Sequence, residues 1–136
     1  MTQEQKDLLV KDLCPRLPYK VKVQDTYYKS LEPAPIWLLD LDAQSVRLFA
    51  DEGYQSIEYI KPYLFPLSSM TEEQKNDCPI NETNLNIIKS NIGYGIIEMP
   101  WRLSYLFVDW CNKNHFDYRG LIPMGLANDA TGLNIY

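Results

Sequence analysis

Near the end of the chain, the side chains of His115, Asp117 and Arg119 have the chemistry for acid–base work or for recognition, and His115 is the only histidine. In an extended segment alternate side chains point the same way, so these three would form one polar row. Phe116 and Tyr118 would then face the other way and anchor the tail in the core. No serine or threonine nucleophile stands beside the histidine, which argues against a catalytic triad. We expect an outward row that helps to hold the tail in place, and its three residues are the candidate partner-binding residues.

Cys111 and His115 are four positions apart at the end of an expected helix, a spacing that brings a thiol and an imidazole to one face. Such a pair could act as an activated nucleophile. Catalysis would also need an oxyanion hole and a lowered thiol pKa. The alternative is a buried cysteine and a histidine favoured by the negative end of the helix. A small enzyme that uses His115 with Asp117 or Cys111 is therefore one alternative function.

Asp40 and Asp42 would share one side of a strand, where two carboxylates could hold a divalent cation. Without further ligands, they are better explained as solvent-facing acids of a hairpin. One histidine and three dispersed cysteines (Cys14, Cys78 and Cys111) argue against a structural zinc site. We expect no metal, no cofactor and no catalytic residue, and we expect reduced cysteines in a cytoplasmic protein.

Two capping boxes predict where helices begin. Thr2 with Gln5 has the Thr-x-x-Gln pattern of a box, so residues 2–13 are expected to be helical. The pattern recurs at Thr71, which predicts a second helix within residues 68–78. Proline residues then end the first helix in this interpretation. The chain thus marks two helix starts with the same local chemistry.

Residues 100–113 form the strongest expected helix, with proline at its first position. It is apolar nearly all round, which predicts burial on several sides. Burial of one side in a partner protein is the alternative. Residues 81–95 are rich in asparagine and predict at most a helical turn.

Alternating or apolar runs predict strands at residues 19–24, 36–41, 46–50 and 56–60. Prolines 62 and 66 are expected to end regular structure beyond them. The resulting fold class is α+β: a small antiparallel sheet of three or four strands packed with an N-terminal and a C-terminal helix. A small bent β-barrel with an N-terminal helix is the alternative. Residues 1–136 are expected to form one domain.

The net charge of −5 and the sequence pI near 4.8 restrict the class of partner. A net acidic charge argues against binding to nucleic-acid phosphates or an anionic membrane, which needs clustered cations, although it does not exclude a basic partner or a small basic cluster. We therefore expect no direct nucleic-acid partner and no membrane partner. An acidic inhibitor that mimics nucleic acid is a second alternative function.

Two segments, "IKPYLFPLSSMTEEQ" at 60–74 and "HFDYRGLIPMGLA" at 115–127, resemble a group of small proteins associated with prophages and other mobile elements of gut Bacteroidales bacteria. The resemblance implies a bacterial or phage cytoplasmic setting and no particular catalytic residue. Together with the missing catalytic motifs, it favours a non-enzymatic accessory or interaction protein of a phage or mobile element. Its expected partner is a host or phage protein.

Overall fold

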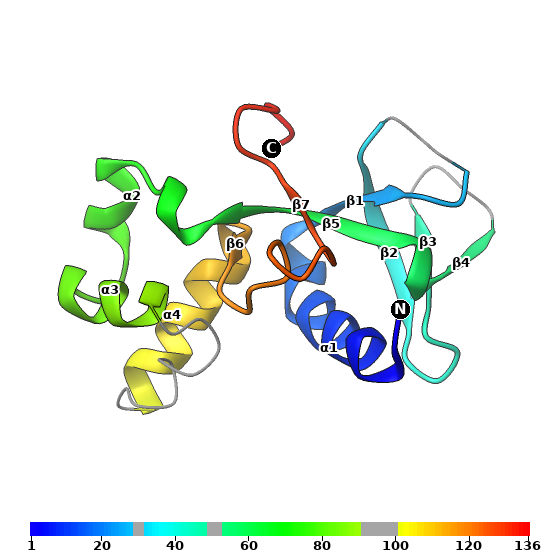
Figure 1. Cartoon of the computed structure of the whole chain (residues 1–136), viewed down its shortest axis with the longest axis horizontal. Coiled ribbons are helices and arrows are strands. Elements are labelled where there is room, and N and C mark those ends of the chain that lie inside the picture. The colour runs from blue at the N-terminus through cyan, green and yellow to red at the C-terminus, as the bar shows by residue number, and fades with distance from the viewer. Residues whose placement is uncertain (29–31, 49–52, 91–100) are drawn as a thin grey trace.

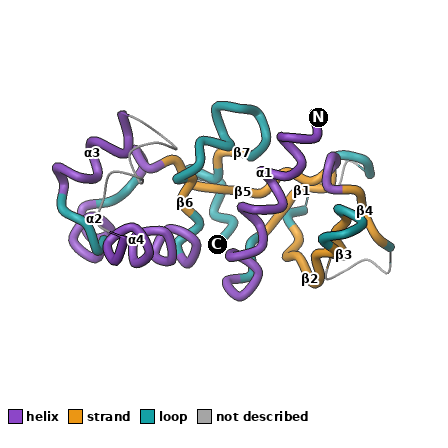
Figure 2. Tube along the Cα trace, turned by 90° about the horizontal axis from the view of Figure 1, so that it is seen from below, coloured by secondary structure: helices purple, strands orange, loops and turns teal. Residues whose placement is uncertain are grey.

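The computed structural model describes residues 1–28, 32–48, 53–90 and 101–136, and within them the fold is α+β (Figure 1). The helices are α1 (Gln3–Leu13), α2 (Glu72–Asp77), α3 (Glu82–Ser90) and α4 (Trp101–Lys113). The strands are β1 (Lys22–Asp25), β2 (Ala34–Asp40), β3 (Ser45–Leu48), β4 (Tyr54–Ser56), β5 (Ile60–Pro66), β6 (Phe116–Asp117) and β7 (Asn128–Asp129). Figures 1 and 2 place α2, α3 and α4 at the opposite end of the molecule from β2, β3 and β4.

The described strands form one mixed sheet with the order β4-β3-β2-β1-β5-β6, and β7 also pairs with β5. The prediction of three or four strands was too low. The sheet is not purely antiparallel, because β6 and β7 both run parallel to β5. Within the described ranges the strands do not close into a barrel, so the barrel alternative is wrong. The two-residue strands β6 and β7 are too short for an alternating pattern to predict them.

The N-terminal helix begins as predicted, with Thr2 and Gln5 forming both hydrogen bonds of the capping box. Leu9 and Leu13 of α1 are fully buried in the core between this helix and the sheet. The chain does not leave helical structure at the prolines but continues as a 3₁₀ helix over Cys14–Tyr19. Pro15 stands in the first turn of this 3₁₀ helix, where a proline loses no intrahelical hydrogen bond, whereas Pro18 lies inside it. This continuation places Arg16 inside the protein, where it is fully buried.

Strand β5 contradicts the expectation that prolines break the structure after residue 60, since Pro62 lies within it, opposite Val23. Paired residues of an antiparallel ladder alternate between hydrogen-bonded and non-hydrogen-bonded positions. Thr26 N–H donates to the Tyr59 carbonyl, so the alternation puts Pro62 at a non-hydrogen-bonded position facing β1. The missing proline N–H therefore removes no hydrogen bond to that neighbour. The predicted strand at residues 56–60 was misplaced, because Ile57–Tyr59 is a 3₁₀ turn.

The hairpin of β2 and β3 was predicted, although β2 begins two residues earlier than expected, within the Glu-Pro-Ala-Pro stretch. Ile36 pairs with Leu48 and Leu38 pairs with Arg47, so one extra residue, Trp37, forms a bulge. A bulge of this kind turns the local side chains relative to a regular strand.

A second apolar core lies among α3, α4, β6 and the segments on either side of α2, and it includes Phe107 and Trp110. Helix α2 has the predicted capping box at Thr71. Helix α4 is buried on one face only, since Tyr105 and Leu106 are exposed, so burial on several sides was wrong. Helix α3 is a nine-residue helix where only a turn was expected. The Asn-rich residues 91–95 and the expected helix start at Pro100 lie outside the described residues.

Candidate functional site

The predicted polar row of His115, Asp117 and Arg119 does not point outward. His115 and Asp117 are buried, and only the Arg119 side chain keeps partial contact with solvent. His115 has φ of 59°, in the left-handed region, which takes it out of the strand, and Asp117 is buried because both sides of β6 are covered. Phe116 and Tyr118 are buried as predicted. Partner binding by the row stays a prediction, with Arg119 as its most accessible member.

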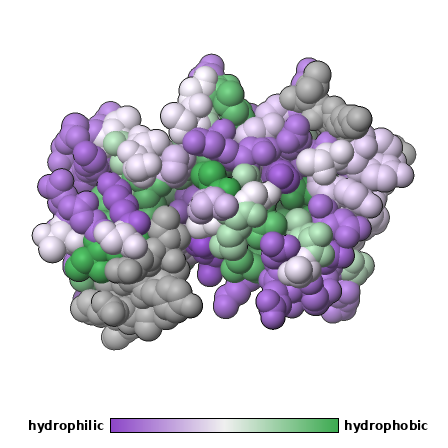
Figure 3. Space-filling model, in the orientation of Figure 1, coloured by the Kyte–Doolittle hydropathy of each residue, from purple (hydrophilic) through white to green (hydrophobic). Residues whose placement is uncertain are grey.

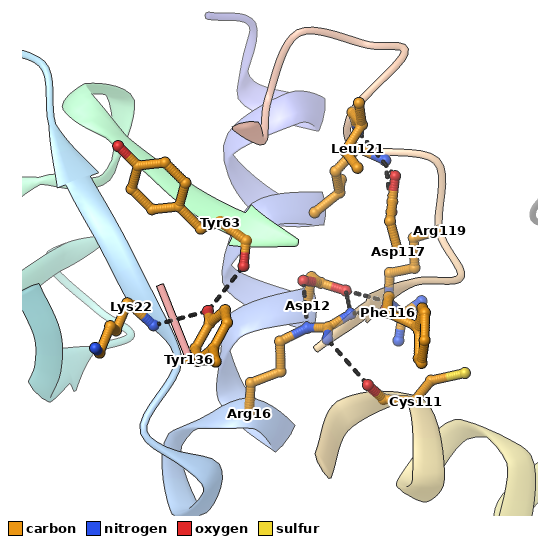
Figure 4. Close-up of polar contacts among 11 residues, drawn as sticks. Asp12, Arg16, Lys22, Tyr63, Cys111, Phe116, Asp117, Arg119, Leu121 and Tyr136 are labelled. Atoms are coloured by element: carbon orange, nitrogen blue, oxygen red, sulfur yellow. Dashed lines mark hydrogen bonds and ion pairs between the residues drawn. The ribbon is translucent and has the colours of Figure 1, made fainter. Parts of the chain in front are cut away.

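Asp117 organises the turn that follows it. Its Oδ1 accepts a hydrogen bond from Leu121 N–H and its Oδ2 one from Ile122 N–H, each at 2.9 Å (Figure 4). Burial raises the pKa of this carboxyl, and the two backbone donors partly offset that rise. The carboxylate thus serves to fix the loop after β6.

A buried ion pair between Arg16 and Asp12, which sequence reasoning missed, lies at the centre of this region. The guanidinium binds the carboxylate with two contacts, Nε to Oδ2 at 2.8 Å and Nη2 to Oδ1 at 3.1 Å. Both side chains are fully buried. Burial by itself lowers the pKa of Arg16, but the adjacent Asp12 carboxylate outweighs this and raises it. The spacing of four residues was the available signal, because i and i+4 meet on a helix.

The same guanidinium also binds two main-chain carbonyls from the end of the chain (Figure 4). Arg16 Nη2 donates to the Phe116 carbonyl at 2.9 Å, and Nη1 donates to the Cys111 carbonyl at 3.4 Å. The guanidinium of Arg119 approaches from the tail, with Nε 3.3 Å from Asp12 Oδ1. The arrangement links α1, the end of α4 and the tail around one carboxylate.

The ring of Tyr118 lies near both of these cations. The Arg119 guanidinium carbon is 4.9 Å from the ring centroid and that of Arg16 is 5.3 Å away. Such distances allow favourable cation–π contacts. The two arginines of this region therefore both lie against Asp12.

His115 packs against Tyr136, the last residue of the sequence given. The two rings are stacked with centroids 3.8 Å apart and planes 10° apart. Burial, followed by the positive charges of Arg16 and Lys22, lowers the pKa of His115 to about 4. Tyr136 is 42% exposed as a whole residue, but its hydroxyl lies between Lys22 N–H and the Tyr63 carbonyl, and burial at that end raises its pKa to about 12. At neutral pH the site therefore joins two uncharged rings.

The Cys111 thiol lacks the features of an activated nucleophile. It is fully buried, and burial raises its pKa well above the ordinary value, which outweighs the opposing effect of Arg16. A catalytic cysteine needs the opposite shift. All three cysteines are free thiols.

The Asp40 carboxylate at the hairpin takes part in the turn, where its Oδ1 accepts a hydrogen bond from Ala43 N–H at 2.9 Å. Across the described part of the chain, no three or more histidine, cysteine or acidic side chains gather as metal ligands would.

Large side chains gather on the outer side of β2, β3 and β4. The pairing register places Leu38, Arg47 and Tyr54 opposite one another on these three strands, so their side chains share one side. The bulge adds Trp37, which is 64% exposed, while Tyr54 is 56% and Leu38 41% exposed. We call Trp37, Leu38, Arg47 and Tyr54 the outer hairpin face. Figure 3 shows many pale residues of intermediate hydropathy at this end of the molecule, on the side that it presents.

Comparisons of the chain with protein-family models, with curated proteins and with solved structures found no match. Within the residues that the structure describes, no helix is long and apolar enough to span a membrane.

Proposed function

We propose that the chain is a non-enzymatic interaction protein that binds a partner protein through the outer hairpin face. The supporting observation is the alignment of Leu38, Arg47 and Tyr54 across three strands, with Trp37 turned outward beside them by a bulge. Tryptophan, tyrosine and arginine are the residue types enriched in the binding hot spots of protein interfaces.

The groups that could do chemistry support a non-enzymatic role. The imidazole of His115 is stacked under Tyr136, the Asp117 oxygens accept backbone N–H groups, and the Cys111 thiol is fully buried. A small enzyme built on His115 would need this site to open toward a substrate.

The partner class follows from the face itself. Two aromatic rings and a leucine around one arginine fit a protein surface that offers an apolar recess with an acidic rim. The alternative of an acidic mimic of nucleic acid rests on the net charge and draws no support from this face, which carries a cation. The setting, a cytoplasmic accessory protein of a phage or mobile element with a host or phage partner, rests on the sequence resemblance.

Affinity capture from a lysate of a gut Bacteroidales bacterium, the host that the sequence resemblance implies, tests this proposal. The wild type is compared with the double variant Trp37→Ala/Tyr54→Ala and with Tyr105→Ala, whose tyrosine is exposed on α4 at the other end of the molecule. We expect at least one protein to be recovered about ten-fold less with the double variant and unchanged with Tyr105→Ala. Equal recovery of every protein with all three chains would contradict the proposal.

A further inference from the structure

The hydroxyl of Tyr136 stands where the ladder between β1 and β5 opens. The register that pairs Val23 with Pro62 would next pair Lys22 with Tyr63, at a hydrogen-bonded position. Instead, Lys22 N–H donates to the Tyr136 hydroxyl at 3.1 Å, and this hydroxyl donates to the Tyr63 carbonyl at 2.8 Å (Figure 4). The phenol thus bridges two backbone groups that would otherwise face each other.

The rest of the ring is held on several sides. His115 stacks on it, and the ring of Phe65 lies 5.9 Å away, centroid to centroid. The ammonium group of Lys22 is 6.0 Å from the ring centroid and donates to the Ile135 carbonyl at 2.6 Å. We call the backbone groups of Lys22 and Tyr63 with the rings of His115 and Phe65 the tyrosine site. It recognises a phenol through both its ring and its hydroxyl.

The segment between Ala130 and Tyr136 makes few contacts with the rest of the protein. Ala130 is fixed to β5 by its N–H, which donates to the Leu64 carbonyl at 2.8 Å. Residues 131–134 are exposed, and Gly132 and Asn134 have positive φ, which these two residue types tolerate. A hollow of about 410 Å³ lies beside them, lined by Lys22, Pro33, Tyr63, Leu133, Asn134 and Ile135. The segment itself forms one wall of this hollow, which is open to solvent.

We propose that the tyrosine site binds a tyrosine-bearing segment of a partner protein, and that residues 130–136 occupy it as an internal ligand in the free chain. An internal ligand on a short connection has an effective concentration of about millimolar order, so only a partner segment that binds better displaces it. A partner can bind better by filling the hollow that the internal segment leaves. This inference does not rest on the outer hairpin face, since none of that face's four residues contributes to the tyrosine site.

The test uses a fluorescent peptide with the sequence of residues 130–136, Ala-Thr-Gly-Leu-Asn-Ile-Tyr, and the variant Tyr136→Ala of the 136-residue chain. Fluorescence anisotropy should show binding to Tyr136→Ala at least about ten-fold tighter than to the wild type, whose site is filled. A peptide ending in phenylalanine should bind about five- to ten-fold more weakly, because it cannot bridge Lys22 and Tyr63. The single histidine gives one set of imidazole NMR signals, which should shift on addition of the tyrosine peptide.

Circular dichroism and thermal melting confirm the fold of the variant first. If Tyr136→Ala does not fold, Tyr136→Phe serves in its place, because it keeps the ring and weakens only the hydroxyl bridge; it should bind the tyrosine peptide better than the wild type does. Failure of every folded variant to bind, or equal binding of the tyrosine and phenylalanine peptides, would overturn the proposal. A wild-type dimer that dissociates in the Tyr136→Ala variant would assign the site to the tail of a second copy and overturn the partner assignment. The two experiments are independent. Loss of capture by the Trp37→Ala/Tyr54→Ala variant would leave the peptide results for the tyrosine site unchanged.

Discussion

The buried guanidinium of Arg16 donates a hydrogen bond from Nη2 to the main-chain oxygen of Phe116, 2.9 Å away, across 100 positions of sequence. The same group holds the Asp12 carboxylate with two contacts. Because Phe116 belongs to β6 and packs in the second core, this one side chain connects the first helix to that core. The main role of these buried polar residues is therefore to hold together parts of the fold that are distant in the sequence.

Replacing Arg16 with methionine should lower the free energy of unfolding by about 3–5 kcal/mol. The variant leaves the Asp12 carboxylate buried with only the partly exposed Arg119 nearby, and an uncompensated buried charge is strongly destabilising. Urea unfolding followed by circular dichroism measures the change.

The double variant Asp12→Leu/Arg16→Met is the matched control for that experiment. Replacing a whole buried ion pair by apolar side chains costs less than breaking it, so the double variant should be more stable than Arg16→Met alone. A double variant less stable than the single one would show that the Arg16 contacts to the carbonyls matter more than the paired charge.

Patterns that depend on neighbours in the sequence were predictable here. The capping boxes at Thr2 and Thr71 and the hairpin around residues 41–44 are local, and each appears as expected. The parallel pairing of β6 and β7 with β5 was not predictable, because two residues carry no periodicity and the pairing depends on a distant strand.

The candidate site shows the same limit. Alternation predicted the inward direction of Phe116 and Tyr118 correctly, but it assumed a regular strand and so placed His115 and Asp117 outside. The left-handed backbone at His115 takes that residue out of the alternation, and Asp117 is buried because both sides of β6 are covered. Tyr136, which stacks on His115 from the far end of the tail, has no signal in the local sequence that would link the two.

Acid should destabilise the protein through its single histidine. The pKa of His115 is about 4 in the folded chain against an ordinary value of 6.5, so the unfolded chain binds more protons between these values. The stability that depends on neutral His115 is fully present above pH 6.5 and is lost as the pH falls toward 4. A shift of this size corresponds to roughly 3 kcal/mol. Urea unfolding at pH 4.5 and pH 7, with an NMR titration of the imidazole, measures it.

His115→Asn is the control, because asparagine tolerates the left-handed backbone and does not titrate. The variant loses the ring stack at every pH, yet its stability should fall less between pH 7 and pH 4.5 than that of the wild type. The raised pKa of Asp117 has the opposite sign, since its ionisation lowers stability as the pH rises, and it cancels in the comparison provided that the substitution leaves it unchanged. Equal pH dependence of the two chains would show that His115 titrates normally.

The three thiols should react with iodoacetamide in an order set by burial. Cys14 and Cys78 are half-buried, whereas Cys111 is fully buried with a pKa raised well above its ordinary value. Because the thiolate is the reactive form, Cys111 should react only when the fold opens. Peptide mass spectrometry after timed labelling measures the order, and labelling in denaturant gives the reference rates. Early modification of Cys111 in the native protein would mean that the thiol is accessible. That result would favour the alternative of a small enzyme that uses Cys111.

Tyr136→Phe should lower the free energy of unfolding by about 1 kcal/mol, the usual net value of an intramolecular hydrogen bond. The phenylalanine ring can still stack on His115, but the hydroxyl that joins Lys22 N–H to the Tyr63 carbonyl is gone. The Lys22 amide should therefore exchange its hydrogen with solvent faster, as two-dimensional NMR measures. Tyr105→Phe, at an exposed tyrosine on α4, should change neither quantity. Unchanged protection of Lys22 in Tyr136→Phe would mean that β1 and β5 close and bond directly, and that the phenol holds the ladder open without adding stability.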